Sequence, residues 1–200
     1  MTDKGTAKLN MTKRAASLIA LLLCFLITAA AAGCAARSDA EKQVAKELDA
    51  LKSSESVGSE VSDIQKILSK EGKEDFDTFL KKIRDFDYEL MGVKEEDDHA
   101  TVTVRIKTYA FGKEYLAEWT DYLKEHDDTI SGDEELADFY EELFDRLADL
   151  DKKECIRDVD IVCVKSLENG EWIANIKDNE QLQDAVFGGM MSEMKTLAEE

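Results

Sequence analysis

Residues 100–108 alternate between apolar and polar side chains, and this alternation limits the folds open to the chain. Ala100, Val102, Val104 and Ile106 are separated by threonine and arginine residues. Because successive side chains of a β-strand point to opposite faces, the pattern predicts a strand with one buried and one solvent-facing side. Such strands belong in an antiparallel sheet that is covered on one face.

Two β-hairpins are expected. The strands are predicted at 86–93, 100–110, 159–163 and 172–176. The charged segment Lys94–His99 is expected to be the loop of the first hairpin, and Asn169-Gly170 predicts a type I′ turn in the second.

Helical periodicity occupies the rest of the chain. Apolar residues recur at spacings of three and four around 44–51, 61–68, 76–83, 115–123, 136–150 and 179–200. Ser38-Asp39-Ala40-Glu41 is a capping box that starts the first helix, and Gly72 is expected to end the second. Gly188-Gly189 should interrupt the last helix.

The expected order is three helices, a hairpin, two helices, a second hairpin and a terminal helix. Segregated strands and helices favour an α+β fold, with an antiparallel sheet packed by helices on one face. A doubly wound parallel sheet would need strands and helices to alternate, so this order argues against it.

The N-terminal segment has the layout of an export signal. Lys13-Arg14 precedes an apolar run from Ala15 to Ala32, and Gly33-Cys34 follows. Ala31-Ala32-Gly33-Cys34 resembles a lipobox, which implies that Cys34 is lipid-modified and becomes the N-terminus. An uncleaved helix is the alternative, because about 18 apolar residues is the lower limit for spanning a bilayer. The tapering small residues favour cleavage.

These features divide the chain into three parts: a signal peptide over 1–33, a lipid-anchored spacer over 34–37 and a single α+β domain over 38–200. The expected location is the extracytoplasmic face of the cell membrane. Two or more acyl chains, such as palmitate, would make the attachment at Cys34 durable.

The mature chain would be strongly acidic. Removing residues 1–33 takes four of the 26 basic and one of the 45 acidic residues, so the net charge falls from −19 to −22. A field of this sign repels nucleic acid and anionic lipid, and both are excluded as favoured partners. High solubility is the simplest explanation of the charge.

Cys155 and Cys163 are the cysteines that remain in the domain after Cys24 is cleaved off and Cys34 is acylated. They lie eight residues apart in one expected strand, a separation of about 26 Å. A disulfide needs Cα atoms within about 7 Å, so both are predicted to be core thiols.

Residues 127–138 partly match a calcium-binding loop, because Gly132 occupies its sixth place. Its oxygen ligands would be Asp127, Thr129, Ser131, Asp133 and Asp138. Because threonine and serine replace carboxylates there, Ser131–Glu134 is better interpreted as a capping box for the next helix. His99 and His126 stand in acidic loops with no second histidine or cysteine at ligand spacing. No metal or cofactor is therefore assigned.

Two C-terminal patterns have simple explanations. Ser192-Glu193-Met194-Lys195 matches a Ser-x-x-Lys string but lacks its companion motifs, so it is interpreted as chance. The methionine-rich face at 186–197 suits a partner groove, although packing against the domain is the commoner arrangement. No catalytic residue is assigned.

The order of elements resembles the cystatin-like, nuclear transport factor 2-like superfamily, in which a curved antiparallel sheet wraps helices into a cone. The resemblance rests on Tyr88–Leu90 paired with Val102–Val104, on Thr108–Phe111, and on Gly170–Ile173 through to Gly188-Gly189. The chain is most similar to uncharacterised lipoproteins of this type from Gram-positive bacteria.

The resemblance implies a pocket without specifying its chemistry. A non-catalytic module that binds a small apolar ligand or an envelope protein is the leading hypothesis. One alternative is an isomerase- or dehydratase-like enzyme, since enzymes of the superfamily use a carboxylate and a tyrosine inside the cone. Tyr88, Tyr109, Tyr115, Tyr122 and Tyr140 offer the phenols. A purely structural interaction protein is the third hypothesis, and the oligomeric state is left open.

Overall fold

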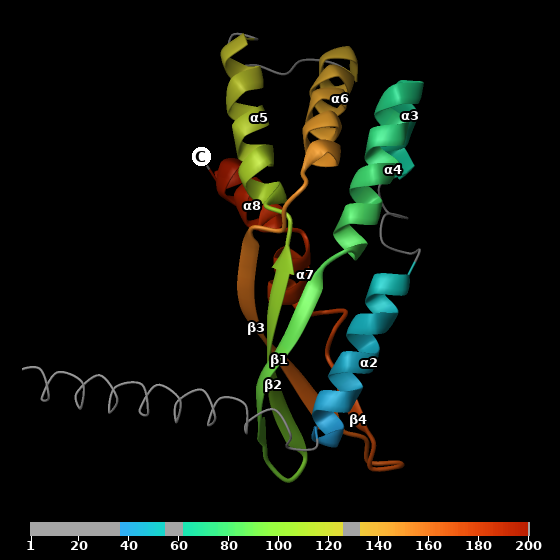
Figure 1. The fold of residues 1–200 in the computed structure, drawn as a ribbon, viewed down its shortest axis with the longest axis vertical. Helices are drawn as coiled ribbons and strands as arrows, with labels where there is room; N and C mark the ends of the chain where they lie inside the picture. The colour runs from blue at the N-terminus through green and yellow to red at the C-terminus, as the bar shows by residue number, and fades with distance from the viewer. Residues whose placement is uncertain (1–36, 55–61, 126–132, 200) are drawn as a thin grey trace, which may run out of the picture. The chain divides into compact units, whose positions relative to one another are not determined.

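Four antiparallel strands follow one another across a single open sheet in the order β1-β2-β3-β4 (Figure 1). Their bounds are Asp87–Glu95 for β1, His99–Thr108 for β2, Cys155–Lys165 for β3 and Trp172–Ala174 for β4. The structure is a computed structural model that describes residues 37–54, 62–125 and 133–199. The α+β class and the antiparallel sheet are confirmed.

Helices precede, separate and follow the two hairpins, as the periodicity predicts. They are α2 (Asp39–Ser53), α3 (Ser62–Ile67), α4 (Lys70–Arg84), α5 (Phe111–Glu125), α6 (Asp133–Asp149), α7 (Glu180–Val186) and α8 (Met190–Glu199). The contacts that hold these elements together lie within Ser38–Glu200.

The two faces of the sheet differ in burial. On β2, every second residue from Ala100 to Thr108 is buried, and Val159, Ile161 and Cys163 continue this buried face on β3. The opposite face carries polar pairs such as Thr103 with Asp160 at 2.6 Å between the two side-chain oxygens. The predicted one-sided strand is confirmed, because the helices cover only the apolar face.

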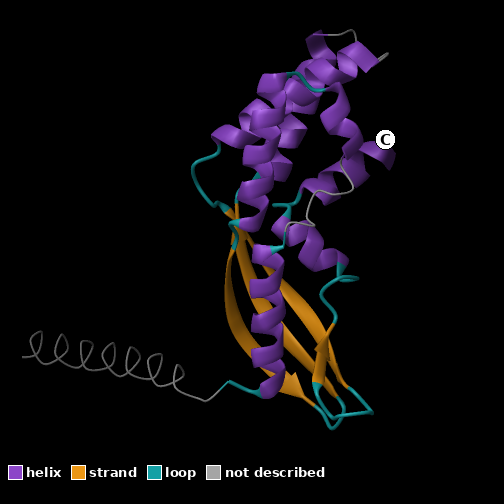
Figure 2. Cartoon of the chain, turned by 90° about the vertical axis from the view of Figure 1, so that its right-hand side faces the viewer, coloured by secondary structure: helices purple, strands orange, loops and turns teal. Residues whose placement is uncertain are grey.

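Helix α2 lies along the sheet (Figure 2). The predicted capping box is present: the Glu41 N–H donates to Ser38 Oγ at 3.2 Å, and the Ser38 N–H donates to Glu41 Oε2 at 2.8 Å. Further along, the Tyr88 hydroxyl of β1 donates to Asp49 Oδ1 at 2.9 Å. The tyrosine bond joins α2 to β1, whereas the capping box satisfies the first N–H groups of the helix.

Gly72 does not end a helix, and that prediction is wrong. Ser69 caps α4 by accepting the Gly72 N–H at 3.1 Å, so the glycine lies in the first turn. A Cβ at this position would lie 2.9 Å from Glu141 Cγ of α6. The glycine therefore serves the close approach of α6, and aromatic rings such as Phe76 and Phe144, with centroids 4.8 Å apart, fill the α4–α6 interface.

Both hairpins form, but their loops differ from the prediction. The first loop is only Glu96–Asp98, and the Glu96 N–H donates to the His99 carbonyl at 2.7 Å. In the second, the Ser166 N–H donates to the Glu171 carbonyl at 2.8 Å, which leaves a four-residue loop over 167–170. The prediction of a two-residue type I′ turn is therefore wrong, although Gly170 does take a positive φ of 71°.

The C-terminal helix is broken where the two glycines predict. Gly188 and Gly189 have φ values of 58° and 86°, and α8 then turns back against α5. Met190 and Leu197 pack on the core, whereas Met191 and Met194 stay exposed. Among the described helices, none is both long enough and apolar enough to cross a bilayer.

Candidate functional site

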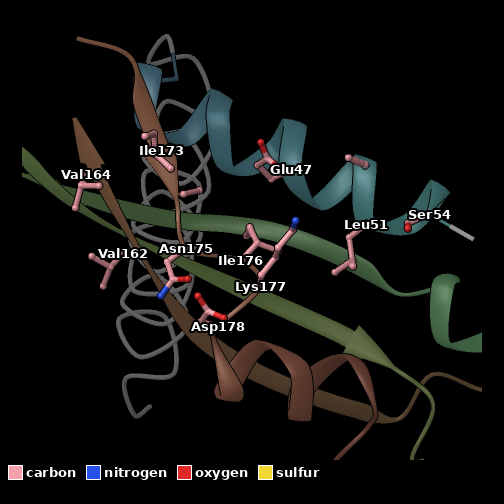
Figure 3. Close-up of a pocket in the computed structure, with 12 residues that line it drawn as sticks. Glu47, Leu51, Ser54, Val162, Val164, Ile173, Asn175, Ile176, Lys177 and Asp178 are labelled. Atoms are coloured by element: carbon pink, nitrogen blue, oxygen red, sulfur yellow. The ribbon is translucent and has the colours of Figure 1, made fainter. Parts of the chain in front are cut away.

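A groove of about 840 Å³ opens between α2 and the β3–β4 edge of the sheet (Figure 3). Its lining consists mainly of aliphatic side chains, with a few polar groups among them. The lining residues are Glu47, Ala50, Leu51, Ser54, Val162, Val164, Ile173, Ala174, Asn175, Ile176, Lys177 and Asp178. We call this cavity the α2–β4 groove.

The groove exists because β4 is much shorter than β3. After Ala174 the chain leaves the strand, and the Asn175 N–H donates to the Val162 carbonyl at 2.9 Å. Val162 and Val164 point away from the covered face and remain 46% and 40% exposed, and Ile173 of β4 is 55% exposed. Three aliphatic side chains thus stay open to solvent at one edge of the sheet.

Polar groups surround this aliphatic surface. Figure 3 shows Glu47 on α2 and Asn175, Lys177 and Asp178 on the segment that follows β4. That segment is held in place because the Gln183 amide donates to the Lys177 carbonyl at 2.6 Å. An apolar lining with a few oriented polar groups suits a small apolar or amphipathic ligand.

Glu118 is a second notable feature, because it is a carboxylate with only 1% of its surface exposed. It lies on α5 and forms an ion pair with the Arg146 guanidinium of α6. Burial raises the pKa of Glu118 to about 7, Arg146 opposes this shift, and a hydrogen bond with Glu142 adds to it. These charges connect α5 to α6 and do not line the α2–β4 groove.

A hollow of about 770 Å³ lies at the start of α7 and α8 and contains Arg157, Asp184 and Ser192. Asp184 Oδ2 accepts from Arg157 Nη1 at 2.5 Å and from the Ser192 hydroxyl at 2.6 Å. The Ser192 N–H also donates to Asp184 Oδ1 at 2.8 Å. Within the Ser192–Lys195 string, the serine hydroxyl therefore serves to hold α8 to α7.

The predicted tyrosines occupy several different environments. Tyr109 donates its hydroxyl to Asp85 Oδ2 at 3.0 Å, and Lys153 Nζ lies 3.1 Å from Asp85 Oδ1. Burial by itself would raise the pKa of Asp85, but the hydrogen bonds from Lys153 and Tyr109 keep this pKa below its ordinary value. This tyrosine–carboxylate pair is not enclosed, because the Asp85 side chain is 57% exposed.

The other four tyrosines do not bring a hydroxyl to a buried carboxylate in any contact that the structure describes. Tyr88 bonds to Asp49 and to the Ala45 carbonyl, and the Tyr122 hydroxyl donates to the Glu135 carbonyl at 2.7 Å. Tyr115 and Tyr140 pack in the aromatic layer between α5 and α6. Burial raises the pKa of both phenols.

Several of the residues singled out from the sequence lie outside the described part of the chain. These are Cys34, His126, Asp127, Thr129, Ser131 and Gly132. The lipid anchor and the calcium-loop alternative therefore remain predictions. Of the loop's remaining positions, Asp133 begins α6 and Asp138 lies within it.

His99 is exposed, and its Nδ1 lies 2.5 Å from Asp98 Oδ1. Within residues 37–54, 62–125 and 133–199, no group of three or more His, Cys, Asp or Glu side chains is arranged to hold a metal ion.

Cys155 and Cys163 lie in the same strand and are both free thiols, as predicted. The prediction that both are core thiols is wrong for Cys155, which is partly exposed at the start of β3. They pair with Thr108 and Ala100, near opposite ends of β2. Burial, with a smaller contribution from Glu95, raises the pKa of Cys163 to about 11. The buried thiol is therefore a core residue.

Comparisons with known proteins give little further information. No family model matches the chain, and no curated protein matches it. A solved structure, ycdA of Bacillus subtilis, which is provisionally described as a lipoprotein, is 13% identical with a TM-score of 0.40. The likeness covers 74% of this chain and 55% of ycdA, so this chain spans about half of the length of ycdA. A likeness of this degree decides neither fold nor function.

The groove residues and Glu118 are absent from the sequence-based candidates. Val159–Val164 reads Val-Asp-Ile-Val-Cys-Val, and such a nearly continuous apolar run indicates a strand with apolar side chains on both faces. Glu118 follows Tyr115 by three residues and precedes Tyr122 by four, so it lies on the apolar stripe of its helix. Both signals were present in the sequence.

Proposed function

We propose that this chain is a lipid-anchored binding protein on the extracytoplasmic face of the cell membrane, and that it holds a small apolar or amphipathic ligand in the α2–β4 groove. The observation that carries the proposal is the groove itself. It combines a volume of about 840 Å³ with exposed Val162, Val164 and Ile173. Pockets of this size and lining are typical of small-molecule sites.

The polar groups at the opening indicate an amphipathic ligand. Lys177 provides a cation, Glu47 and Asp178 provide carboxylates, and Asn175 and Ser54 provide neutral hydrogen-bonding groups close to the aliphatic lining. A molecule with an apolar tail and a polar head would bury its tail against Val162 and Val164. Removing that apolar area from water is the main favourable contribution to binding.

The proposed anchor rests on the sequence. Lys13-Arg14, the apolar run Ala15–Ala32 and the small residues before Cys34 form a cleavable lipoprotein signal. The proposal includes cleavage after Gly33, acylation of Cys34 with palmitate or similar chains, and a domain that starts at Ser38. Acyl chains on one cysteine would keep the groove close to the membrane.

The proposed fold type is the cone of the nuclear transport factor 2-like superfamily. An antiparallel sheet with helices on one face supports it. The groove lies at the β4 edge of this sheet and is formed in part by Val162 and Val164 of its uncovered face.

Two measurements test the proposed function. Radiolabelled palmitate should be incorporated into the wild type and into Cys155→Ala, but not into Cys34→Ala; label in Cys34→Ala would contradict the anchor. For the groove, the chain from Ala35 onward, which keeps every described groove contact, is purified without detergent and extracted with organic solvent. Mass spectrometry should find an apolar or amphipathic molecule in stoichiometric amount, and the extracted protein should take up an added fatty acid. A protein that contains no such molecule and does not take up the fatty acid would contradict the groove as a binding site.

A further inference from the structure

Exposed aliphatic side chains gather on the β3–β4 hairpin. Val162, Val164 and Ile173 lie on its strands, and Leu167 in its loop is fully exposed at 103% of its reference area. The other half of the same sheet face is mostly polar, with Arg105 Nε donating to Asp158 Oδ1 at 2.7 Å, although Ile156 there is also exposed. Exposed aliphatic side chains are therefore more numerous at the loop end of the hairpin than at its other end.

The two hairpin loops and the start of α2 lie at the same end of the domain. Figures 1 and 2 show the first turn of α2 beside both loops in two perpendicular views. The loops are joined to each other, because the Lys165 N–H donates to the Asp98 carbonyl at 2.9 Å and Lys165 Nζ donates to the Asp97 carbonyl at 3.0 Å. We call this region the loop end.

The short spacer limits how far the loop end can be from the anchor. Cys34 precedes the N-cap Ser38 by four residues. A fully extended chain of that length reaches about 14 Å. The spacer length therefore keeps the acylated cysteine within about that distance of Ser38. Within the domain, α5 and α6 lie at the end opposite to the loop end (Figure 1).

The charge of the loop end limits how deeply it can enter a membrane. Glu96, Asp97, Asp98, Glu168 and Glu171 are all exposed in or beside the two loops. Carboxylates favour water over the hydrocarbon layer, so contact would be shallow and would suit an uncharged surface. The lipid anchor gives the loop end a high local concentration at the bilayer. A small favourable free energy from burying Leu167 is therefore sufficient for contact.

We propose that the loop end is a membrane-contact surface, in which Leu167 enters the headgroup layer of a zwitterionic phospholipid bilayer to which Cys34 anchors the chain. This proposal rests on lipid attachment at Cys34. It places the α2–β4 groove beside the bilayer, because Val162, Val164 and Ile173 continue from the loop end into the groove.

The test uses the full chain, produced in a bacterium that processes lipoproteins and reconstituted into phosphatidylcholine vesicles. An environment-sensitive dye is attached to Glu168→Cys beside Leu167, or to the matched control Glu125→Cys at the far end of α5. Both variants also carry Cys155→Ser, which removes the partly exposed native thiol. A quencher in the lipid headgroup region then reports contact with the bilayer, and flotation of the vesicles reports the anchor separately.

The dye at position 168 should be quenched about threefold more than the dye at position 125, as expected for a side chain at the headgroup boundary. Adding Leu167→Ser should make the quenching at position 168 nearly equal to that at position 125. Flotation with equal quenching at both positions overturns the membrane-contact surface alone. Quenching at position 168 that survives Leu167→Ser overturns the role of Leu167. Failure to float overturns the anchor and this inference with it.

Discussion

The carboxylate of Glu118 on α5 contacts the guanidinium of Arg146 on α6, and Glu118 is almost completely buried while Arg146 is 42% exposed. The ion pair lies beside the aromatic layer in which Trp119 and Phe139 have centroids 5.5 Å apart. A buried acid that is only partly compensated makes stability depend on pH.

Glu118→Gln should remove part of that dependence. The folded-state pKa of Glu118 is raised to about 7 from an ordinary 4.5, so its protonated form is favoured by folding. The stabilising contribution is fully present below about pH 4.5 and is lost as the pH rises through 7, at a cost of up to about 3 kcal/mol. Urea unfolding at pH 5 and pH 8 should show a larger loss in the wild type than in Glu118→Gln.

Glu125→Gln is the matched control, since Glu125 is exposed on the same helix. Its pH profile should follow that of the wild type. Parallel profiles for the wild type and Glu118→Gln would show that Glu118 is ionised at the same pH in the folded and unfolded chain.

Asp184→Ala should loosen α8 while the sheet stays folded. The substitution removes the acceptor of Arg157 and of both Ser192 bonds, at a cost of about 3 kcal/mol. Hydrogen exchange should accelerate in α8 more than in β2. Ser192→Ala removes only the hydroxyl bond and should cost about 1 kcal/mol. Unchanged exchange in α8 after Asp184→Ala would show that the carboxylate does not hold this helix.

Gly188→Ala should be far more damaging than Gly170→Ala, although both glycines have positive φ. A Cβ at Gly188 would lie 2.1 Å from the Tyr109 carbonyl oxygen, whereas nothing lies within 4 Å at Gly170. Backbone strain alone costs about 1 kcal/mol at Gly170, and the clash should bring Gly188→Ala to about 4 kcal/mol. Equal free energies of unfolding for the two variants would place Gly188 away from Tyr109.

The two domain thiols should react at very different rates. Cys155 is partly exposed, whereas Cys163 is buried and its pKa is raised to about 11. A thiol reagent at neutral pH should modify Cys155 in the native protein and reach Cys163 only on unfolding, because the thiolate is the reactive form. Fast labelling of both thiols in the native state would contradict the burial of Cys163.

Elements with a strict local pattern are predictable from the sequence. The alternation at Ala100–Thr108 and the capping box at Ser38 each depend on neighbouring residues, and both are present in the structure. The predictions made from Gly72 and Asn169-Gly170 are wrong because their structure depends on contacts beyond the neighbouring residues. Gly72 is set by contact with Glu141, which is distant in the sequence, and the second loop is set by the pairing of Lys165 with Trp172.

The groove could not be predicted because it depends on distant elements. The apolar run Val159–Val164 shows that both faces of β3 carry aliphatic side chains. Which of them remains uncovered is decided by the short β4 and by the position of α2. Glu118 is similar, since its helix position predicts burial but only the packing of α6 supplies Arg146 as its partner.

The central claim is that the α2–β4 groove binds an apolar or amphipathic molecule, and a matched pair of substitutions tests it most directly. Ile173 lines the groove and is 55% exposed, whereas Ile156 lies at the far end of β3, outside the groove, and is 57% exposed. Titration of the wild type, Ile173→Glu and Ile156→Glu with a fluorescent fatty acid compares the two positions. Ile173→Glu should weaken binding at least about tenfold, since a carboxylate would face the apolar tail, and Ile156→Glu should leave it unchanged. Equal affinity for all three proteins, or no binding by the wild type, would contradict the groove as the binding site.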